Sequence, residues 1–136
     1  QVIHLTPEQH VFVTERHLAT LTTLRADGSP HVVPVGFTWD PDAGVVRIIT
    51  SGTTVKAKNA GRPDADGRPS RAVVCQVEGG RWITLEGPAS VLTEPDEVLE
   101  AEQRYARRYK VPRENPARVV VVITPDRVMS SSYMAR

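Results

Sequence analysis

Residues 45–59, VVRIITSGTTVKAKN, contain the side chains best suited to chemistry in this chain. The β-branched start of this segment predicts a strand, and residues 50–54 form a turn rich in hydroxyl groups. Lys56 and Lys58 then open a short basic helix, with Asn59 close behind. The first N–H groups of a helix have no partner inside it, and its dipole favours negative charge. Hydroxyl and ammonium groups would complete a shell around an anion, so the pattern predicts a phosphate site.

The same segment has a simpler interpretation. Ser and Thr residues in front of a helix are common N-caps, and lysines on a short helix usually face solvent. The sequence holds neither a P-loop nor a Gly-x-Gly-x-x-Gly fingerprint. Spacing alone therefore leaves both interpretations open.

Nucleophilic and metal-dependent catalysis find little support. The single cysteine, Cys75, lies in the apolar run AVVCQV, which indicates a buried thiol. The four histidines are scattered, and no His-Glu-x-x-His or Gly-x-Ser-x-Gly motif is present. His17 and His31 are better functional candidates than the two N-terminal histidines, although a lone histidine is more often structural. We predict no metal site and identify no catalytic acid–base pair.

The composition sets limits on the class of protein. A chain of 136 residues predicts one domain over residues 1–136 with one hydrophobic core. A net charge of +1 gives no sign of a nucleic-acid or membrane partner, and no apolar run approaches the ~18 residues of a membrane span. One cysteine fits a reducing compartment and no secretory signal is visible, so we expect a cytoplasmic protein.

Glycine, proline and hydrophobic patterns predict the elements that position the candidate residues. Pro34 inside a strand marks an edge, a bulge or a place where another group approaches the backbone. Short turns between the strands favour a mainly β, α+β fold: a six-stranded antiparallel barrel with Greek-key connections and two to three helices. We expect strands at residues 18–24, 31–38, 45–49, 71–77, 82–92 and 118–124, helices at 7–15, around Lys56 and at 94–109, and an extended tail at 126–136. Residues 18–24 alternate as a strand requires, and Gly87-Pro88 indicates a bend in the fifth strand.

Several stretches together resemble one known superfamily. They are LATLTT at 18–23, DGSPHVVPV at 27–35, TSGTTVKAKN at 50–59 and WITLEG at 82–87. These stretches are similar to the split β-barrel flavin/deazaflavin oxidoreductases, which are named after pyridoxamine 5′-phosphate oxidase. The RYARRY stretch at 104–109 resembles the branch that uses the deazaflavin coenzyme F420, and within it the biliverdin reductases.

The resemblance implies a homodimer with its cofactor clefts at the subunit interface. It also implies which residues bind the cofactor. His31, Pro34, Val35 and Gly36 would lie beside the fused rings, Thr50, Ser51, Thr54 and Lys56 at the phosphate, Lys58 and Asn59 at the phosphate or the acidic tail, and Gln76 and Trp82 on the opposite wall. Residues 62–70 look longer than in that family, which leaves the shape of the cleft rim open.

The implied activity is hydride transfer from reduced F420 to an unsaturated small-molecule acceptor, such as biliverdin or a similar tetrapyrrole. In such enzymes the cofactor supplies the reactivity and the protein supplies position and electrostatics. Two alternatives remain: an FMN-binding oxidoreductase with the same fold, and a non-catalytic protein that binds F420 or a tetrapyrrole.

Overall fold

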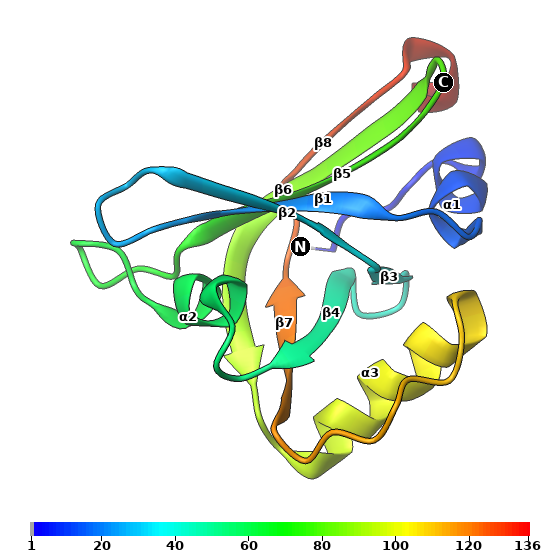
Figure 1. Cartoon of the computed structure of the whole chain (residues 1–136). Coiled ribbons are helices and arrows are strands. Elements are labelled where there is room, and N and C mark those ends of the chain that lie inside the picture. The colour runs from blue at the N-terminus through cyan, green and yellow to red at the C-terminus, as the bar shows by residue number, and fades with distance from the viewer. Residues whose placement is uncertain (1) are drawn as a thin grey trace.

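The computed structural model describes residues 2–136, which form one antiparallel sheet of eight strands and three α-helices (Figure 1). The mainly β fold expected from the sequence is therefore confirmed. The elements are α1 (Pro7–Thr14), β1 (Ala19–Leu24), β2 (Pro30–Val35), β3 (Thr38–Asp40), β4 (Val45–Ser51), α2 (Val55–Gly61), β5 (Arg71–Glu78), β6 (Arg81–Leu92), α3 (Pro95–Arg108), β7 (Arg118–Ile123), β8 (Arg127–Ser130) and a 3₁₀ turn at Ser132–Ala135.

The strands pair in two sets, β2-β1-β5-β6-β8 and β6-β7-β4-β3, and the long strand β6 belongs to both. The strand order is β2-β1-β5-β6-β7-β4-β3, and β8 also pairs with β6. The bend expected at Gly87-Pro88 lies where β6 leaves β5 and begins to pair with β7. A Cβ atom on Gly87 would lie 2.0 Å from the carbonyl oxygen of Thr124, so only glycine allows β6 to pass this close to the segment after β7.

A break between β2 and β3 corrects the expectation of six strands. The strand expected at residues 31–38 is two strands, because β2 pairs with β1 up to Val35 and β3 pairs with β4 from Thr38. Gly36 and Phe37 connect these strands, which lie at opposite ends of the strand order. Hydrogen bonds therefore do not close the sheet, and a six-stranded barrel is not confirmed.

The C-terminal tail adds the eighth strand. Residues expected to form an extended tail include β8, which pairs with Ile83–Glu86 of β6. The 3₁₀ turn after it buries Met134, whose carbonyl oxygen accepts a hydrogen bond of 2.5 Å from the Thr6 hydroxyl. Thr6 also caps α1 in a capping box with Gln9, so one threonine fixes both termini.

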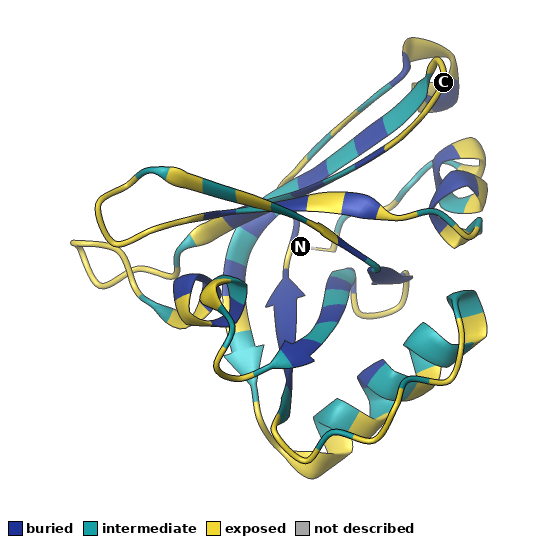
Figure 2. Ribbon diagram, viewed as in Figure 1, coloured by how far each residue is buried: buried dark blue, intermediate teal, exposed yellow. Residues whose placement is uncertain are grey.

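The hydrophobic core lies inside the curled sheet. Buried and more exposed residues alternate along β1 and β6, as the period of a half-buried strand requires (Figure 2). The largest buried side chains of the core include Phe12, Leu21, Phe37, Ile48, Val74, Ile83 and Leu85. Helix α3 covers β4 and β7 through a smaller cluster around Ala101. None of the helices within residues 2–136 is both long and apolar enough to span a membrane.

Asp40 fixes the turn that precedes β4. Its buried carboxylate lies 2.7 Å from Arg47 and 3.1 Å from Arg104, and it also accepts the N–H groups of Asp42 and Ala43 at 3.0 and 3.1 Å. Burial alone raises the pKa of Asp40, but the hydrogen bonds from Arg47 and the turn outweigh it and hold the pKa below its usual value.

Replacing this carboxylate should destabilise the protein in a pH-dependent way. We expect Asp40→Asn to lower the free energy of unfolding by about 3 kcal/mol near neutral pH, because Arg47 is left buried without its partner. A lowered folded-state pKa contributes stability above the unfolded pKa, and this contribution disappears as pH falls through the folded pKa. In urea titrations, the difference between variant and wild type should therefore shrink in acid.

The exposed neighbour Asp42 provides the matched control. Asp42→Asn changes the same group in the same turn and should alter stability by less than about 0.5 kcal/mol. Equal effects of the two substitutions at neutral pH would contradict the role given to Asp40.

Candidate functional site

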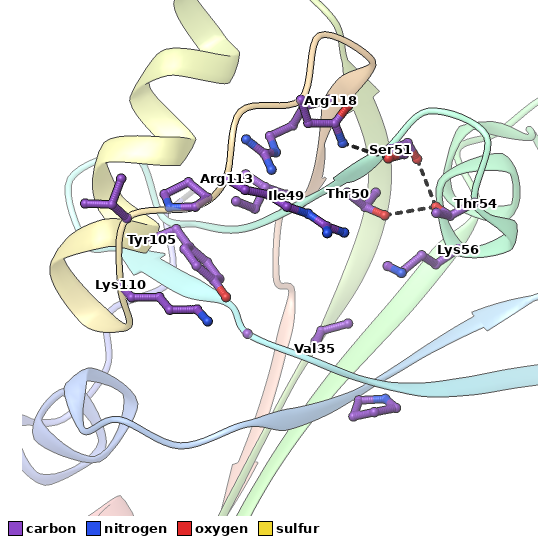
Figure 3. A pocket seen from close by; sticks show the side chains of 15 residues that line it. Val35, Ile49, Thr50, Ser51, Thr54, Lys56, Tyr105, Lys110, Arg113 and Arg118 are labelled. Atoms are coloured by element: carbon purple, nitrogen blue, oxygen red, sulfur yellow. Dashed lines mark hydrogen bonds between the residues drawn. The ribbon is translucent and has the colours of Figure 1, made fainter.

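A cavity of about 630 Å³ opens beside the break between β2 and β3. Its walls come from four places in the chain: the end of β2, the end of β4 with the start of α2, one side chain of α3, and the loop that leads to β7 (Figure 3). The lining residues are Pro34, Val35, Gly36, Ile49, Thr50, Ser51, Thr54, Lys56, Tyr105, Lys110, Val111, Pro112, Arg113, Asn115 and Arg118.

One end of the cavity is a polar corner made by Thr50, Ser51, Thr54 and Lys56. Thr54 is the N-cap of α2, accepting the N–H of Ala57 at 3.3 Å, and its hydroxyl lies 3.0 Å from that of Thr50. The N-cap interpretation is therefore confirmed. The same cap orients the first turn of α2 so that Lys56 borders the cavity (Figure 3).

The opposite wall is aromatic. The rings of Tyr105 and Tyr109 lie 4.9 Å apart at the end of α3, and both pack over the backbone of Gly36. A Cβ atom on Gly36 would lie 3.0 Å from each ring, closer than ordinary packing allows. Gly36 therefore allows both rings to lie directly on the β2–β3 connection.

Two side chains at the end of α3, which we call the α3 clamp, hold the connection between β2 and β3. Arg108 donates hydrogen bonds to the carbonyl oxygens of Phe37 at 2.5 Å and Glu15 at 2.8 Å. Tyr109 accepts the N–H of Phe37 at 3.3 Å and donates to the carbonyl oxygen of His17 at 2.6 Å. The clamp thus gives hydrogen-bond partners to the N–H and C=O groups of Phe37, which pairs with no neighbouring strand.

The clamp lies in a poorly solvated environment. Burial lowers the pKa of the Arg108 guanidinium from its usual value, and burial raises the pKa of the Tyr109 phenol. Arg108 also stacks over the ring of Phe37 at 4.6 Å and donates to Oε1 of Gln76 at 2.6 Å. Because Arg108 and Tyr109 are hydrogen-bonded in this way, they hold the β2–β3 connection in a single arrangement.

The loop after α3 and the first residue of β7 contribute most of the positive charge around the cavity. Asn115 fixes the loop to the polar corner by donating to the Ser51 hydroxyl at 2.8 Å. Arg118 is ion-paired with Glu102 at 2.7 Å, whereas Lys110 and Arg113 are exposed and make no ion pair within residues 2–136. Among the described residues, four cationic side chains and no carboxylate line the cavity. Its field therefore favours an anionic ligand.

Seven of the twelve residues predicted to bind a cofactor lie around this cavity. They are Pro34, Val35, Gly36, Thr50, Ser51, Thr54 and Lys56. Their role in binding stays a prediction, but the fold brings them to one place from two separate segments.

The other five predicted residues do not line the cavity. Gln76 is fully buried and donates to the carbonyl oxygen of Phe12 at 2.8 Å, in addition to accepting from the clamp. Asn59 is also buried and donates to the Thr23 hydroxyl at 3.1 Å. Both amides therefore have structural partners within the chain.

His31, Lys58 and Trp82 are placed differently. His31 is half-buried on β2, and its Nδ1 atom has no hydrogen-bond partner in the part of the chain that the structure describes. Lys58 is exposed, and Trp82 is half-buried on β6 opposite Val77. These three positions lie outside the lining of the cavity, and a role for them in binding is untested.

Sequence reasoning missed the half of the cavity that follows Tyr105. Tyr105 and residues 112–116 are not among the residues that the sequence predicted to bind a ligand. The signal that was available is the run of cations at Arg107, Arg108 and Lys110. Nothing in the run itself distinguishes the buried clamp residue from its exposed neighbours.

A cluster of Glu15, His17 and Glu78 lies outside this cavity, with ligand atoms within 4.8 Å of one another. Arg81 donates to Glu15 at 3.0 Å and contacts Glu78, and it lowers the pKa of Glu15. The Arg81 guanidinium pairs with both carboxylates of the cluster, so we interpret it as an ion-pair network.

The chain belongs to the pyridoxamine 5′-phosphate oxidase family, because the sequence model of that family matches residues 5–131. The resemblance inferred from the sequence is confirmed. The chain is also 51% identical over 128 residues to an F420H(2)-dependent biliverdin reductase of Mycobacterium tuberculosis (strain CDC 1551 / Oshkosh). That alignment covers 94% of this chain and 89% of the relative.

Solved structures share the fold. A conserved hypothetical protein from Mycobacterium tuberculosis matches with a TM-score of 0.73 and 21% identity, covering 96% of this chain and 86% of that one. An F420 reductase matches with a TM-score of 0.65 and 20% identity, covering 88% and 94%. At these identities the two structures show a common fold and nothing further.

Proposed function

We propose that this protein is a coenzyme F420-dependent reductase that transfers a hydride to an unsaturated small-molecule acceptor, with biliverdin or a similar tetrapyrrole as the acceptor. The observation that carries the proposal is the cavity, which has an aromatic wall opposite the polar corner and, within residues 2–136, four cationic side chains and no carboxylate in its lining. The name of the relative with 51% identity supports both the cofactor and the acceptor.

The residues around the cavity fit the cofactor. F420 combines a flat fused ring system, a phosphate and an acidic tail, and these parts need different surroundings. Val35, Ile49 and Tyr105 offer apolar and aromatic surface for a ring. Lys56 and the Ser51 hydroxyl offer charge-assisted hydrogen bonds to a phosphate.

F420, when bound, would supply a hydride from the central carbon of its ring system. The chain itself binds and orients the reactants. Lys56 holds the phosphate, and the wall formed by β2 and Tyr105 fixes the plane of the ring. We place the reaction in the cytoplasm, where the unpaired Cys75 would stay reduced.

Turnover with reduced F420 tests the proposed function. We expect the protein to reoxidise reduced F420 under anaerobic conditions when biliverdin is added, with loss of the green colour. The same assay with reduced FMN should give much slower turnover. Binding of F420 without reoxidation by any of a panel of acceptors would instead identify a non-catalytic carrier. Reoxidation by other acceptors but not by biliverdin would show that biliverdin is not the acceptor.

Lys56 should contribute directly to the affinity for F420. We expect Lys56→Ala to weaken binding by about 1–3 kcal/mol, the range for losing a hydrogen bond to a charged group. The matched control is Lys58→Ala, because Lys58 lies on the same short helix, is exposed and does not line the cavity. Fluorescence titration with oxidised F420 measures both variants, and a wild-type affinity of Lys56→Ala would remove Lys56 from the phosphate site.

We also propose that the protein forms a homodimer through the outer face of the sheet. Val32, Val77 and Met129 are 57%, 60% and 49% exposed on this face. Thr20 and Cys75, which pair across β1 and β5, lie between them. Exposed apolar side chains that share one face of a sheet are typical of a protein–protein interface.

Introducing a charge on this face should separate the subunits. We expect Val32→Glu to shift the protein from dimer to monomer in light scattering, because the carboxylate would be buried without a partner. Leu99→Glu is the control, since Leu99 is similarly exposed at 53% but lies on α3. A wild-type protein that is monomeric at all concentrations would contradict the proposal.

A further inference from the structure

We propose that Tyr105 is the proton donor that completes the reduction of the acceptor. This inference rests on the proposed function, because hydride transfer alone leaves the acceptor one proton short of the reduced product. The structure points to Tyr105 through two independent observations: the chemistry of the other lining residues and the free hydroxyl of this tyrosine.

The lining of the cavity offers few acids. Within residues 2–136, no carboxyl, imidazole or thiol group lines it. Arginine does not give up its proton in proteins, and aliphatic hydroxyls are much weaker acids than a phenol. The Thr50 and Thr54 hydroxyls are moreover bonded to each other at 3.0 Å, and the Ser51 hydroxyl, which accepts from Asn115, lies in the polar corner that would hold the phosphate. The remaining donors are the phenol of Tyr105 and the ammonium groups of Lys56 and Lys110.

The hydroxyl of Tyr105 is available for a ligand. Tyr109, one turn further along the chain, uses its hydroxyl to hold His17 and Phe37. The Tyr105 hydroxyl has no hydrogen-bond partner in the described part of the chain. Figure 3 shows it pointing into the cavity from the α3 side, beside the side chain of Lys110 and towards the end of β2.

The ring of Tyr105 is also held in place. It packs against Tyr109 with centroids 4.9 Å apart and lies directly over Gly36, so the hydroxyl has a fixed position across the cavity. Lys56, by contrast, lies in the polar corner and would be occupied by the phosphate. Lys110 is exposed, on a long flexible side chain. A proton donor must be within hydrogen-bond reach of the reacting atom, and Tyr105 is the better positioned group.

The proposed step balances. The acceptor takes up a hydride from reduced F420, which forms a C–H bond and moves an electron pair to the far end of the conjugated system, a nitrogen in a tetrapyrrole. The O–H bond of Tyr105 breaks as its proton forms the N–H bond. The acceptor gains two electrons and F420 loses two, and the phenolate recovers its proton from water that reaches the open cavity.

Tyr105→Phe tests the assignment, because phenylalanine keeps the ring that packs on Gly36 and Tyr109. We expect kcat with biliverdin to fall at least about 10²-fold, the contribution of a positioned acid. The affinity for F420 should stay within about twofold of wild type, since the hydroxyl and not the ring is removed. A role in packing alone would change affinity or stability and leave kcat largely intact.

Two further measurements separate proton transfer from other effects. The solvent deuterium isotope effect on single-turnover reduction should change in Tyr105→Phe and keep its wild-type value in Tyr133→Phe, which removes the hydroxyl of an exposed residue in the 3₁₀ turn, outside the cavity. Without any turnover, the absorption band of biliverdin bound to the cofactor-free protein should shift between wild type and Tyr105→Phe, because the hydroxyl would donate to a pyrrole nitrogen.

The outcomes are distinguishable. Wild-type kcat in Tyr105→Phe overturns the proposal, and so does a loss of kcat in Lys110→Met together with an unchanged Tyr105→Phe. Failure of the proposed function is read from the wild type, which would then reduce no acceptor with reduced F420, and the role of Tyr105 would fall with it.

Discussion

The structure depends on how the backbone of Phe37 is hydrogen-bonded. Phe37 leaves one ladder and has not yet joined the other, so its N–H and C=O groups have no strand beside them. A buried backbone group without a partner is costly, and the α3 clamp supplies both partners through Tyr109 and Arg108. The planar guanidinium of Arg108 suits this role because it donates in several fixed directions at once, to Phe37, Glu15 and Gln76.

This contact also creates the cavity. Because the clamp holds α3 against the β2–β3 connection, Tyr105 faces the end of β4 across open space and does not pack into the core. The loop after α3 then returns along the cavity to β7, with Asn115 fixed to Ser51. The break in the sheet, the aromatic wall and the loop that leads to β7 are thus joined by one set of hydrogen bonds.

The sequence predicted features that depend on local chemistry. The N-cap before α2, the bend at Gly87 and the alternation along β1 follow from neighbouring residues, and all three are present. The break at Gly36 was not predictable in this way, because an apolar strand pattern runs through it and the hydrogen bond that holds Phe37 comes from Arg108, 71 residues further along the chain. Strand β8 was not predicted for the same reason, because it pairs with β6, which is distant in sequence.

In the candidate site, too, the residues that are close in sequence were predictable and those brought together by packing were not. The polar corner is contiguous in sequence, so its hydroxyls and Lys56 could be grouped before the fold was known. Gln76 was grouped with them by resemblance alone and Asn59 also by its place in the 45–59 segment, and the fold pairs both with other residues of the chain. The contribution of α3 required the packing of Tyr105 over Gly36, which no local pattern encodes.

A crystal structure of the protein with oxidised F420 would test the central claim most directly. The account predicts the phosphate within hydrogen-bond distance of Lys56 and the Ser51 hydroxyl, with the fused ring between β2 and Tyr105. Density for F420 at another surface, or a cavity filled by the protein's own side chains at saturating F420, would contradict it.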